Sequence, residues 1–190
     1  MGRWQPDALG RLQQSALELY SERGFEATAV ADIAERAGLT ERTFFRYFAD
    51  KREVLFDGNQ ELLGMFTDAV ARAAPSLAPM DVVAEALTAS AVFFDGRRAY
   101  ARRRQAVIDA NPSLRERELT KLASMAAAVA DALRDRGVEA AAATLTAEAG
   151  ITVFKVAFAR WLDESTDDDL AAVMRQTLDE LRTVTRSPQA

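Results

Sequence analysis

Side chains that can bind phosphates and base edges gather in one short stretch of the chain, where Arg42, Thr43, Arg46 and Tyr47 follow Thr40. Arginine, threonine and tyrosine donate hydrogen bonds to nucleic-acid phosphates, and arginine also pairs with guanine when a helix lies in the major groove of DNA. Thr40 is a residue type that caps helix starts, because its hydroxyl accepts from a free backbone N–H. The stretch therefore predicts a helix that presents DNA-binding chemistry.

The residues before Thr40 predict a shorter helix and a tight turn that would hold this surface in place. Thr28 is expected to cap a helix over residues 28–37, with Ile33 on its inward side. Gly38 then ends that helix, since glycine adopts the positive φ of a helix C-terminus without strain. Two helices this short bury little surface, so we interpret the unit as one that is presented to a partner.

Composition limits the function classes. The chain has 190 residues, of which 49% are hydrophobic and 28% charged, and this fits one large or two small globular domains. It contains no cysteine and no histidine, which excludes disulfides, thiolate chemistry, and the commonest general base and metal ligand. The sequence also lacks a glycine-rich phosphate loop and a paired nucleophile and base. We therefore expect no enzyme, no metal site and no cofactor.

Charge is distributed unevenly along the chain. The formal net charge is −5, which by itself disfavours a nucleic-acid partner, but the field that a partner meets is local. The segment from Arg36 to Arg52 is net positive, and a second basic run lies between Arg97 and Arg104. Two interpretations of the second run stay open: a solvated helix face, or arginines that contact the DNA-binding region or an anionic ligand.

The periodicity of apolar residues predicts helices throughout, with prolines and glycines between them. Asp50 and Glu53 match a capping box that would open a long fourth helix ending near Ala74. Thr166, which three aspartates follow, is expected to start the last helix. The other helices are predicted over residues 7–23, 80–95, 97–110, 113–136 and 139–164. The predicted fold class is all-α with about nine helices.

No membrane segment is expected. No apolar run approaches the roughly 18 residues that a membrane-spanning helix needs. The first residues, MGRWQPDALGR, lack the apolar core of a signal peptide. We therefore predict a cytoplasmic protein without a membrane partner.

The region over about residues 9–57 resembles the TetR family of bacterial transcriptional regulators. The resemblance is carried by three stretches in a fixed order, ALELYSERGF, TAVADIAERAG and LTERTFFRYFADKREVL. The later segment RRRQAVIDANPSLRERELTKLASM is similar to ligand domains of actinobacterial members. The family implies an N-terminal three-helix, helix-turn-helix DNA-binding domain over residues 1–52. It also implies a C-terminal helical domain over residues 53–190 for ligand binding and dimerisation.

The resemblance implies which side chains contact DNA. Thr28 and Lys51 match positions that bind phosphates, and Glu41 and Arg42 match positions that face base edges. The other candidates are hydroxyl, aromatic and arginine side chains on or beside the third helix. The candidate DNA-binding residues are Thr28, Thr40, Glu41, Arg42, Thr43, Phe45, Arg46, Tyr47 and Lys51.

Phe45 departs from the family pattern. Many members carry tyrosine at this position, and its hydroxyl bonds a phosphate. Phenylalanine has no hydroxyl, so the family's phosphate contact is not expected at Phe45. The alternative contact for the ring is a thymine methyl.

Two further surfaces follow from the resemblance. Large apolar residues of the C-terminal domain are either plain core or the lining of a pocket for a small hydrophobic or amphipathic effector. The pocket candidates are Phe66, Phe93, Tyr100, Met125, Phe154, Phe158 and Trp161. The last two helices carry more apolar surface than one exposed pair needs, which indicates either intrachain core or a homodimer interface. The interface candidates are Phe154, Phe158, Met174, Leu178 and Leu181.

The expected function is that of a homodimeric repressor of transcription. Two-fold symmetry would place two recognition helices about 34–36 Å apart, one turn of B-DNA, on a palindromic double-stranded operator. An unidentified small-molecule ligand would release the protein from that DNA. The alternatives are a helical module that binds another protein, and an enzyme.

Overall fold

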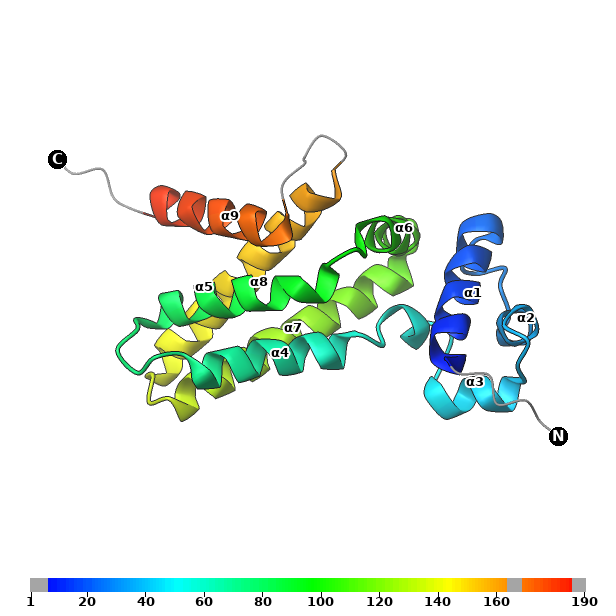
Figure 1. Ribbon diagram of the computed structural model, residues 1–190, viewed down its shortest axis with the longest axis horizontal. Coiled ribbons are helices and arrows are strands. Elements are labelled where there is room, and N and C mark those ends of the chain that lie inside the picture. The colour runs from blue at the N-terminus through cyan, green and yellow to red at the C-terminus, as the bar shows by residue number, and fades with distance from the viewer. Residues whose placement is uncertain (1–6, 164–168, 186–190) are drawn as a thin grey trace. The chain divides into compact units, whose positions relative to one another are not determined.

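The computed structural model describes residues 7–163 and 169–185, and within these ranges every regular element is a helix (Figure 1). The α-helices are α1 (Ala8–Arg23), α2 (Val30–Arg36), α3 (Glu41–Tyr47), α4 (Asn59–Arg72), α5 (Pro79–Ser90), α6 (Arg98–Asp109), α7 (Pro112–Asp135), α8 (Ala140–Leu162) and α9 (Leu170–Val184). Two short 3-10 helices, η1 (Glu53–Leu55) and η2 (Ala91–Phe94), lie between them. The predicted all-α class is confirmed.

The helices form two compact units, and each unit draws on segments that are distant in the sequence. In their described parts, the first unit runs over Met1–Asn59 and Ala99–Leu119, and the second over Gln60–Arg98 and Thr120–Ala190. Most of α6 and the first part of α7 thus belong with the N-terminal helices. The sequence-based division into residues 1–52 and 53–190 does not anticipate this, because contacts between distant segments leave no local pattern.

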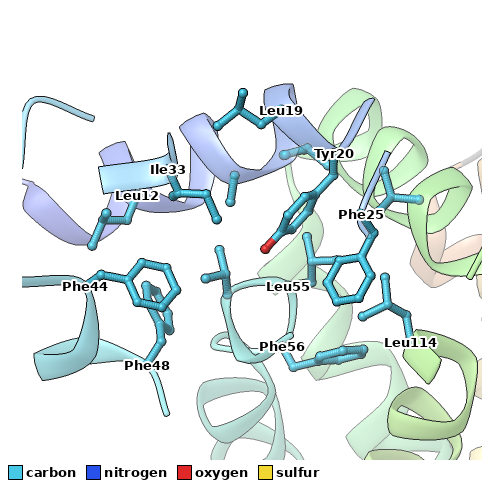
Figure 2. Packing of buried hydrophobic residues seen from close by; sticks show 14 of the residues in the cluster. Leu12, Leu19, Tyr20, Phe25, Ile33, Phe44, Phe48, Leu55, Phe56 and Leu114 are labelled. Atoms are coloured by element: carbon cyan, nitrogen blue, oxygen red, sulfur yellow. The ribbon is translucent and has the colours of Figure 1, made fainter. Parts of the chain in front are cut away.

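The core of the first unit is built mainly from aromatic and long aliphatic side chains (Figure 2). Phe44 and Phe48 are 0% and 3% exposed. Their ring centroids lie 5.3 Å apart. The same cluster includes Leu12 of α1, Ile33 of α2 and Leu114 of α7. Burial of these side chains fixes the face that α3 turns inward, and therefore also the face that it exposes.

In the second unit, α8 packs against both α5 and α9, and α5 also packs against α9. Helix α8 approaches α5 closely at Gly150, where a Cβ atom would lie 2.4 Å from Cγ1 of Val83. Real side chains do not come this close, so the contact requires glycine.

Helix α8 also qualifies the expectation of no membrane segment. It has 23 residues and a mean hydropathy of 1.3 in its most apolar window, enough to cross a membrane by length and composition alone. Nine of its residues are buried within the described chain, among them Ala147, Gly150 and Ala157. Since α5 and α9 cover this face, the apolar residues on that side of α8 are those of a core helix.

The fourth helix begins at Asn59, later than the predicted start at Asp50. The Asp50 carboxylate accepts from the backbone N–H groups of Arg52 and Glu53 at 2.8 and 3.2 Å. These bonds and the Arg52 guanidinium hold the pKa of that carboxyl below its usual range, the guanidinium having the larger effect. Glu53 pairs with Arg117 instead of returning to the Asp50 backbone, so the predicted capping box is incomplete. A short turn with η1 forms in its place.

The start of α9 is partly as expected. The Asp169 side chain caps the helix and accepts from the backbone N–H of Ala172 at 2.6 Å. Asp169 is the last of the three aspartates in the predicted start signal. Thr166, the predicted first residue of that signal, lies outside the described residues.

Candidate nucleic-acid interface

Helix α3 is held at both ends by local structure. The Thr40 hydroxyl accepts from the backbone N–H of Thr43 at 3.2 Å, which confirms the predicted cap. Gly38 has a φ of 65°, and the turn closes with a 2.8 Å hydrogen bond from the Leu39 N–H to the Ala34 carbonyl. Phe48 ends the helix and is buried in the core. The turn signals in the sequence therefore predict the position of α3 correctly.

Four of the predicted DNA contacts on α3 are exposed: Glu41, Arg42, Phe45 and Arg46. Within the described ranges, neither the Glu41 nor the Arg42 side chain forms a hydrogen bond or ion pair, so the Arg42 guanidinium is available to a partner. Phe45 is 54% exposed. A free guanidinium and an exposed ring on one helix face suit the polar and apolar groups of a base edge.

Arg46 and Tyr47 form a pair at the end of the helix. A guanidinium N–H of Arg46 donates to the Tyr47 hydroxyl at 3.1 Å. The guanidinium carbon of Arg46 lies 4.9 Å from the centroid of the Tyr47 ring. Tyr47 is 40% exposed. The two side chains therefore present one positively charged, hydrogen-bonding surface to solvent.

The hydroxyls of Thr40 and Thr43 lie together at the start of α3. Their oxygens are 3.0 Å apart, Thr40 is exposed and Thr43 is half-buried. The structure thus brings seven of the nine predicted DNA contacts onto α3 and its cap. Thr28 and Lys51 are the two that it does not bring there.

Thr28 is 1% exposed, and its side chain faces the end of α1. Its hydroxyl donates to the Gly24 carbonyl at 2.8 Å. The N-cap residue of α2 is Ala29, whose backbone N–H donates to the Asp32 carboxylate at 3.0 Å. The predictions that Thr28 caps this helix and offers its hydroxyl to a phosphate are therefore corrected: Thr28 fastens the turn after α1.

Lys51 points toward backbone carbonyls of the first unit. Its ammonium donates to the carbonyl oxygens of Phe25, Thr28 and Glu26 at 2.9, 3.0 and 3.3 Å. An ammonium has three N–H donors, so these bonds use all of them. It also lies 4.4 Å from the Phe25 ring centroid. The predicted phosphate contact is corrected: Lys51 tethers the α1–α2 loop, and no helix begins at this residue.

Arg104 is a residue of the first unit whose role the sequence left open. Its Nε donates to the Leu55 carbonyl at 2.6 Å, and its guanidinium lies 5.0 Å from the Phe56 ring centroid. Burial lowers the pKa of this guanidinium, and the nearby Glu118 carboxylate opposes the shift. One end of the basic run thus contacts the N-terminal segment, whereas Arg103 is exposed as on a solvated face.

The predicted pocket residues separate into two groups. Phe94, which follows Phe93 in the chain, is the centre of an aromatic cluster. Its ring centroid lies 4.9 Å from Phe93, 5.1 Å from Phe158, 6.0 Å from Trp161 and 6.2 Å from Phe154.

The remaining pocket candidates lie elsewhere. Tyr100 packs against the core of the first unit, so its assignment to a pocket with the aromatic cluster is corrected. Phe66 and Met125 are 0% and 4% exposed in the second unit, and their assignment to a pocket stays a prediction. Two arginines cover cluster rings: Arg97 lies 4.7 Å from the Phe93 centroid and Arg98 5.8 Å from that of Trp161.

Three of the predicted dimer contacts are buried inside the chain. Phe154, Met174 and Leu178 are 7%, 1% and 4% exposed, which leaves almost no surface for a second subunit. Phe158 and Leu181 are half-buried. The structure therefore corrects Phe154, Met174 and Leu178 to intrachain core, because the packing of α8 with α5 and α9 uses these side chains.

A different face of α8 is apolar and open to solvent. Its residues follow one another at alternating spacings of three and four, and they are Ala142, Leu145, Ala149, Thr152, Val156 and Ala159. Leu145 and Val156 are 71% and 40% exposed. We refer to these six residues as the α8 stripe. Such spacing places a narrow apolar band along one side of a helix.

Two family models match the chain. Residues 13–57, which include the α3 surface, match the model for bacterial regulatory proteins of the tetR family. Residues 77–186, more than half of the chain, match the model for the MftR C-terminal domain. The chain belongs to the tetR family. The resemblance predicted from the N-terminal stretches is confirmed.

Several curated tetR-family relatives match in part. The chain is 28% identical over 123 residues to a Mycobacterium tuberculosis protein named as the mycofactocin biosynthesis transcriptional regulator MftR. This match covers 65% of the chain and 62% of the relative. It is also 39% identical over 59 residues to the M. tuberculosis HTH-type transcriptional repressor KstR2, covering 31% of the chain and 28% of that protein. The matches thus span less than two thirds of each relative.

Solved tetR-family structures share the fold over nearly the whole chain. Thermus thermophilus FadR, a repressor in complex with lauroyl-CoA, has a TM-score of 0.58 at 21% identity, with 96% of this chain and 97% of that chain covered. Bacillus subtilis FadR, in complex with stearoyl-CoA, has a TM-score of 0.60 at 19% identity, with 90% and 96% covered. At these identities the likeness establishes the fold.

Proposed function

We propose that this tetR-family protein is a transcriptional repressor that binds a palindromic DNA operator as a homodimer and is released by a small-molecule ligand. The observation that carries the proposal is the two-sided character of α3. Phe44 anchors one side in the core, while the other side presents Arg42, Phe45 and the Arg46–Tyr47 pair to solvent. The names of the regulators that match part of the chain support this assignment.

The residues of α3 divide into two kinds of DNA contact. Arg42 has its guanidinium free within the described residues, and we assign it a bidentate contact with guanine in the major groove. Glu41 beside it can accept a hydrogen bond from cytosine. Thr40, Thr43 and the Arg46–Tyr47 pair are assigned to the sugar-phosphate backbone, which sets the position of α3 without reading sequence.

The α8 stripe is the surface that we assign to the homodimer. A second copy related by a two-fold axis would bury Leu145 and Val156, the large side chains of the stripe that solvent reaches. The three alanines of the stripe, Ala142, Ala149 and Ala159, permit close contact of two helices. To bind successive major grooves on one side of B-DNA, the two α3 helices of such a dimer need a separation of about 34–36 Å.

The aromatic cluster and its arginines are the ligand site that we propose. Phe93, Phe94, Phe158 and Trp161 offer apolar surface, and Arg97 and Arg98 lie over two of these rings. The two FadR structures contain lauroyl-CoA and stearoyl-CoA, ligands with a long apolar chain and an anionic head. An amphipathic anion of this kind suits an aromatic surface with cations at its edge. We assign the protein no enzymatic role and a cytoplasmic location, where its DNA target lies.

Selection of bound sequences from random double-stranded DNA tests the proposal, followed by affinity measurements against salt. We expect an enriched inverted repeat whose half-site centres lie about one helical turn apart. Salt-sensitive binding without an enriched sequence would contradict a repressor. Absence of binding at low salt, in a sample that mass spectrometry finds free of ligand, would contradict DNA binding itself.

A further inference from the structure

We propose that Phe45 reads the C5-methyl group of a thymine, one or two base pairs from the guanine that Arg42 contacts. The inference rests on the proposed function and adds the base, and the atom of that base, that this side chain recognises. It makes Phe45 a specificity-determining residue, although the side chain has no hydrogen-bonding atom.

The exposure of Phe45 is the first observation. Its ring is 54% exposed, whereas the adjacent Phe44 is fully buried. The two rings meet edge to face, with centroids 5.5 Å apart and planes at 82°. The buried Phe44 ring therefore contacts the Phe45 ring, and more than half of Phe45 stays open to solvent.

The chemistry of the ring limits what it can contact on DNA. A phenyl group cannot donate to a phosphate or to a base nitrogen or oxygen. The thymine methyl is the apolar group that the base pairs display in the major groove. The thymine methyl group is therefore the best contact on a base edge for the exposed phenyl ring of Phe45.

The position of Phe45 relative to Arg42 indicates how many base pairs separate the two bases that they contact. The two residues are three apart on α3 and lie on its exposed face. Side chains at this spacing have Cβ atoms about 5–6 Å apart, and successive base pairs lie about 3.4 Å apart. Arg46 cannot compete for the same spot without leaving the Tyr47 hydroxyl, to which it donates. The methyl group should therefore lie one or two base pairs from the Arg42 guanine.

Replacing single thymines by deoxyuridine in the selected operator tests the inference with the full chain. This exchange removes the C5-methyl group and leaves every hydrogen-bonding group of the base in place. We expect that the exchange lowers wild-type affinity about fourfold at one thymine per half-site. This fold-change corresponds to about 0.8 kcal/mol, the free energy of burying one methyl group. Phe45→Ala should bind more weakly and should not distinguish thymine from uracil at that position.

A converse exchange separates methyl recognition from base-pair preference. With a C·G pair at the identified position, 5-methylcytosine should raise wild-type affinity over cytosine, and Phe45→Ala should again be indifferent. Phe45→Leu keeps an apolar side chain and should keep part of the methyl preference. Because more than half of Phe45 is exposed, both variants should remain folded, which urea denaturation checks.

Two results would overturn the inference in distinguishable ways. If wild type binds an enriched operator but is indifferent to every thymine-to-uracil exchange, Phe45 does not read a methyl group and the proposed function still stands. An equal loss in wild type and Phe45→Ala would likewise assign the methyl effect to another residue. If no sequence is enriched, the proposed function fails and the inference fails with it.

Discussion

The ammonium nitrogen of Lys51 lies 2.9 Å from the carbonyl oxygen of Phe25, in the loop that joins α1 to α2. Carbonyls of Glu26 and Thr28 receive its two other donors. The hydroxyl of Tyr20 in turn donates to the backbone carbonyl of Lys51 at 2.6 Å, and burial, more than the nearby charge of Asp50, raises the pKa of that hydroxyl. One lysine therefore joins α1, the loop after it and the turn before η1.

Replacement of this lysine should act on stability. We expect Lys51→Met to lower the free energy of unfolding by about 1–3 kcal/mol, because three carbonyls lose a charged donor. Urea denaturation measures the change, and Lys155→Met, at an exposed lysine of α8, serves as the control. The slope of log affinity against log salt should stay near the wild-type value. If the magnitude of this slope is instead smaller by about one in Lys51→Met, the result would support a contact between Lys51 and a DNA phosphate.

Replacement of Arg42 should act on sequence choice. We expect Arg42→Ala to lose about 1–3 kcal/mol of discrimination at one base pair per half-site, because a bidentate arginine–guanine contact disappears. Selection of bound sequences shows the loss as a relaxed position in the enriched repeat. Arg103→Ala removes an equal charge from an exposed site on α6 and should leave the repeat unchanged. Matching sequence profiles for the two variants would contradict the assignment.

Replacement of Arg104 should loosen the first unit. The side chain is 16% exposed, and its loss leaves the Leu55 carbonyl and the Glu118 carboxylate without this partner. We expect Arg104→Ala to cost about 2–3 kcal/mol, as for a hydrogen bond to a charged group. Arg104→Lys should recover part of this, since it keeps the charge but not the planar group over Phe56. If Arg104→Ala and Arg103→Ala unfold at the same urea concentration, the contact has no energetic role.

Charge placed in the α8 stripe should separate the subunits. Leu145 is 71% exposed, so we expect Leu145→Glu to fold as the wild type does and to sediment as a monomer. Its affinity for the operator should fall because two half-sites no longer bind together. Leu119→Glu, at an exposed leucine of α7 outside the stripe, is the matched control. A dimer that withstands both Leu145→Glu and Val156→Glu would place the interface elsewhere.

The sequence predicts those parts of the interface that local signals determine. The Thr40 cap, the turn at Gly38 and the inward Phe44 are each set by neighbouring residues, and together they fix which side chains of α3 face solvent. For the same reason, the free Arg42 and the exposed Phe45 follow from the helical period alone.

The errors concern bonds between residues that are far apart in the chain. Lys51 reaches a loop 25 and 26 residues earlier, and Arg104 reaches a carbonyl 49 residues earlier. The Glu53–Arg117 pair diverts a side chain that would otherwise complete a capping box. Which carbonyl or carboxylate such a cation meets depends on the tertiary packing, and a lysine or arginine of the same type could equally face solvent.

The contact between Gly150 and Val83 restricts how α5 and α8 can move. The branched Val83 side chain occupies a notch that one absent methyl group leaves in α8. Sliding of α8 along α5 would bring Val83 against Ala147 or Phe154, the residues one turn to either side of Gly150. Rotation of α8 about its own axis would bring a neighbouring side chain of α8 against Val83 in place of Gly150. The two helices are therefore locked in axial register, so a ligand that displaces one of them must carry the other with it as a rigid pair.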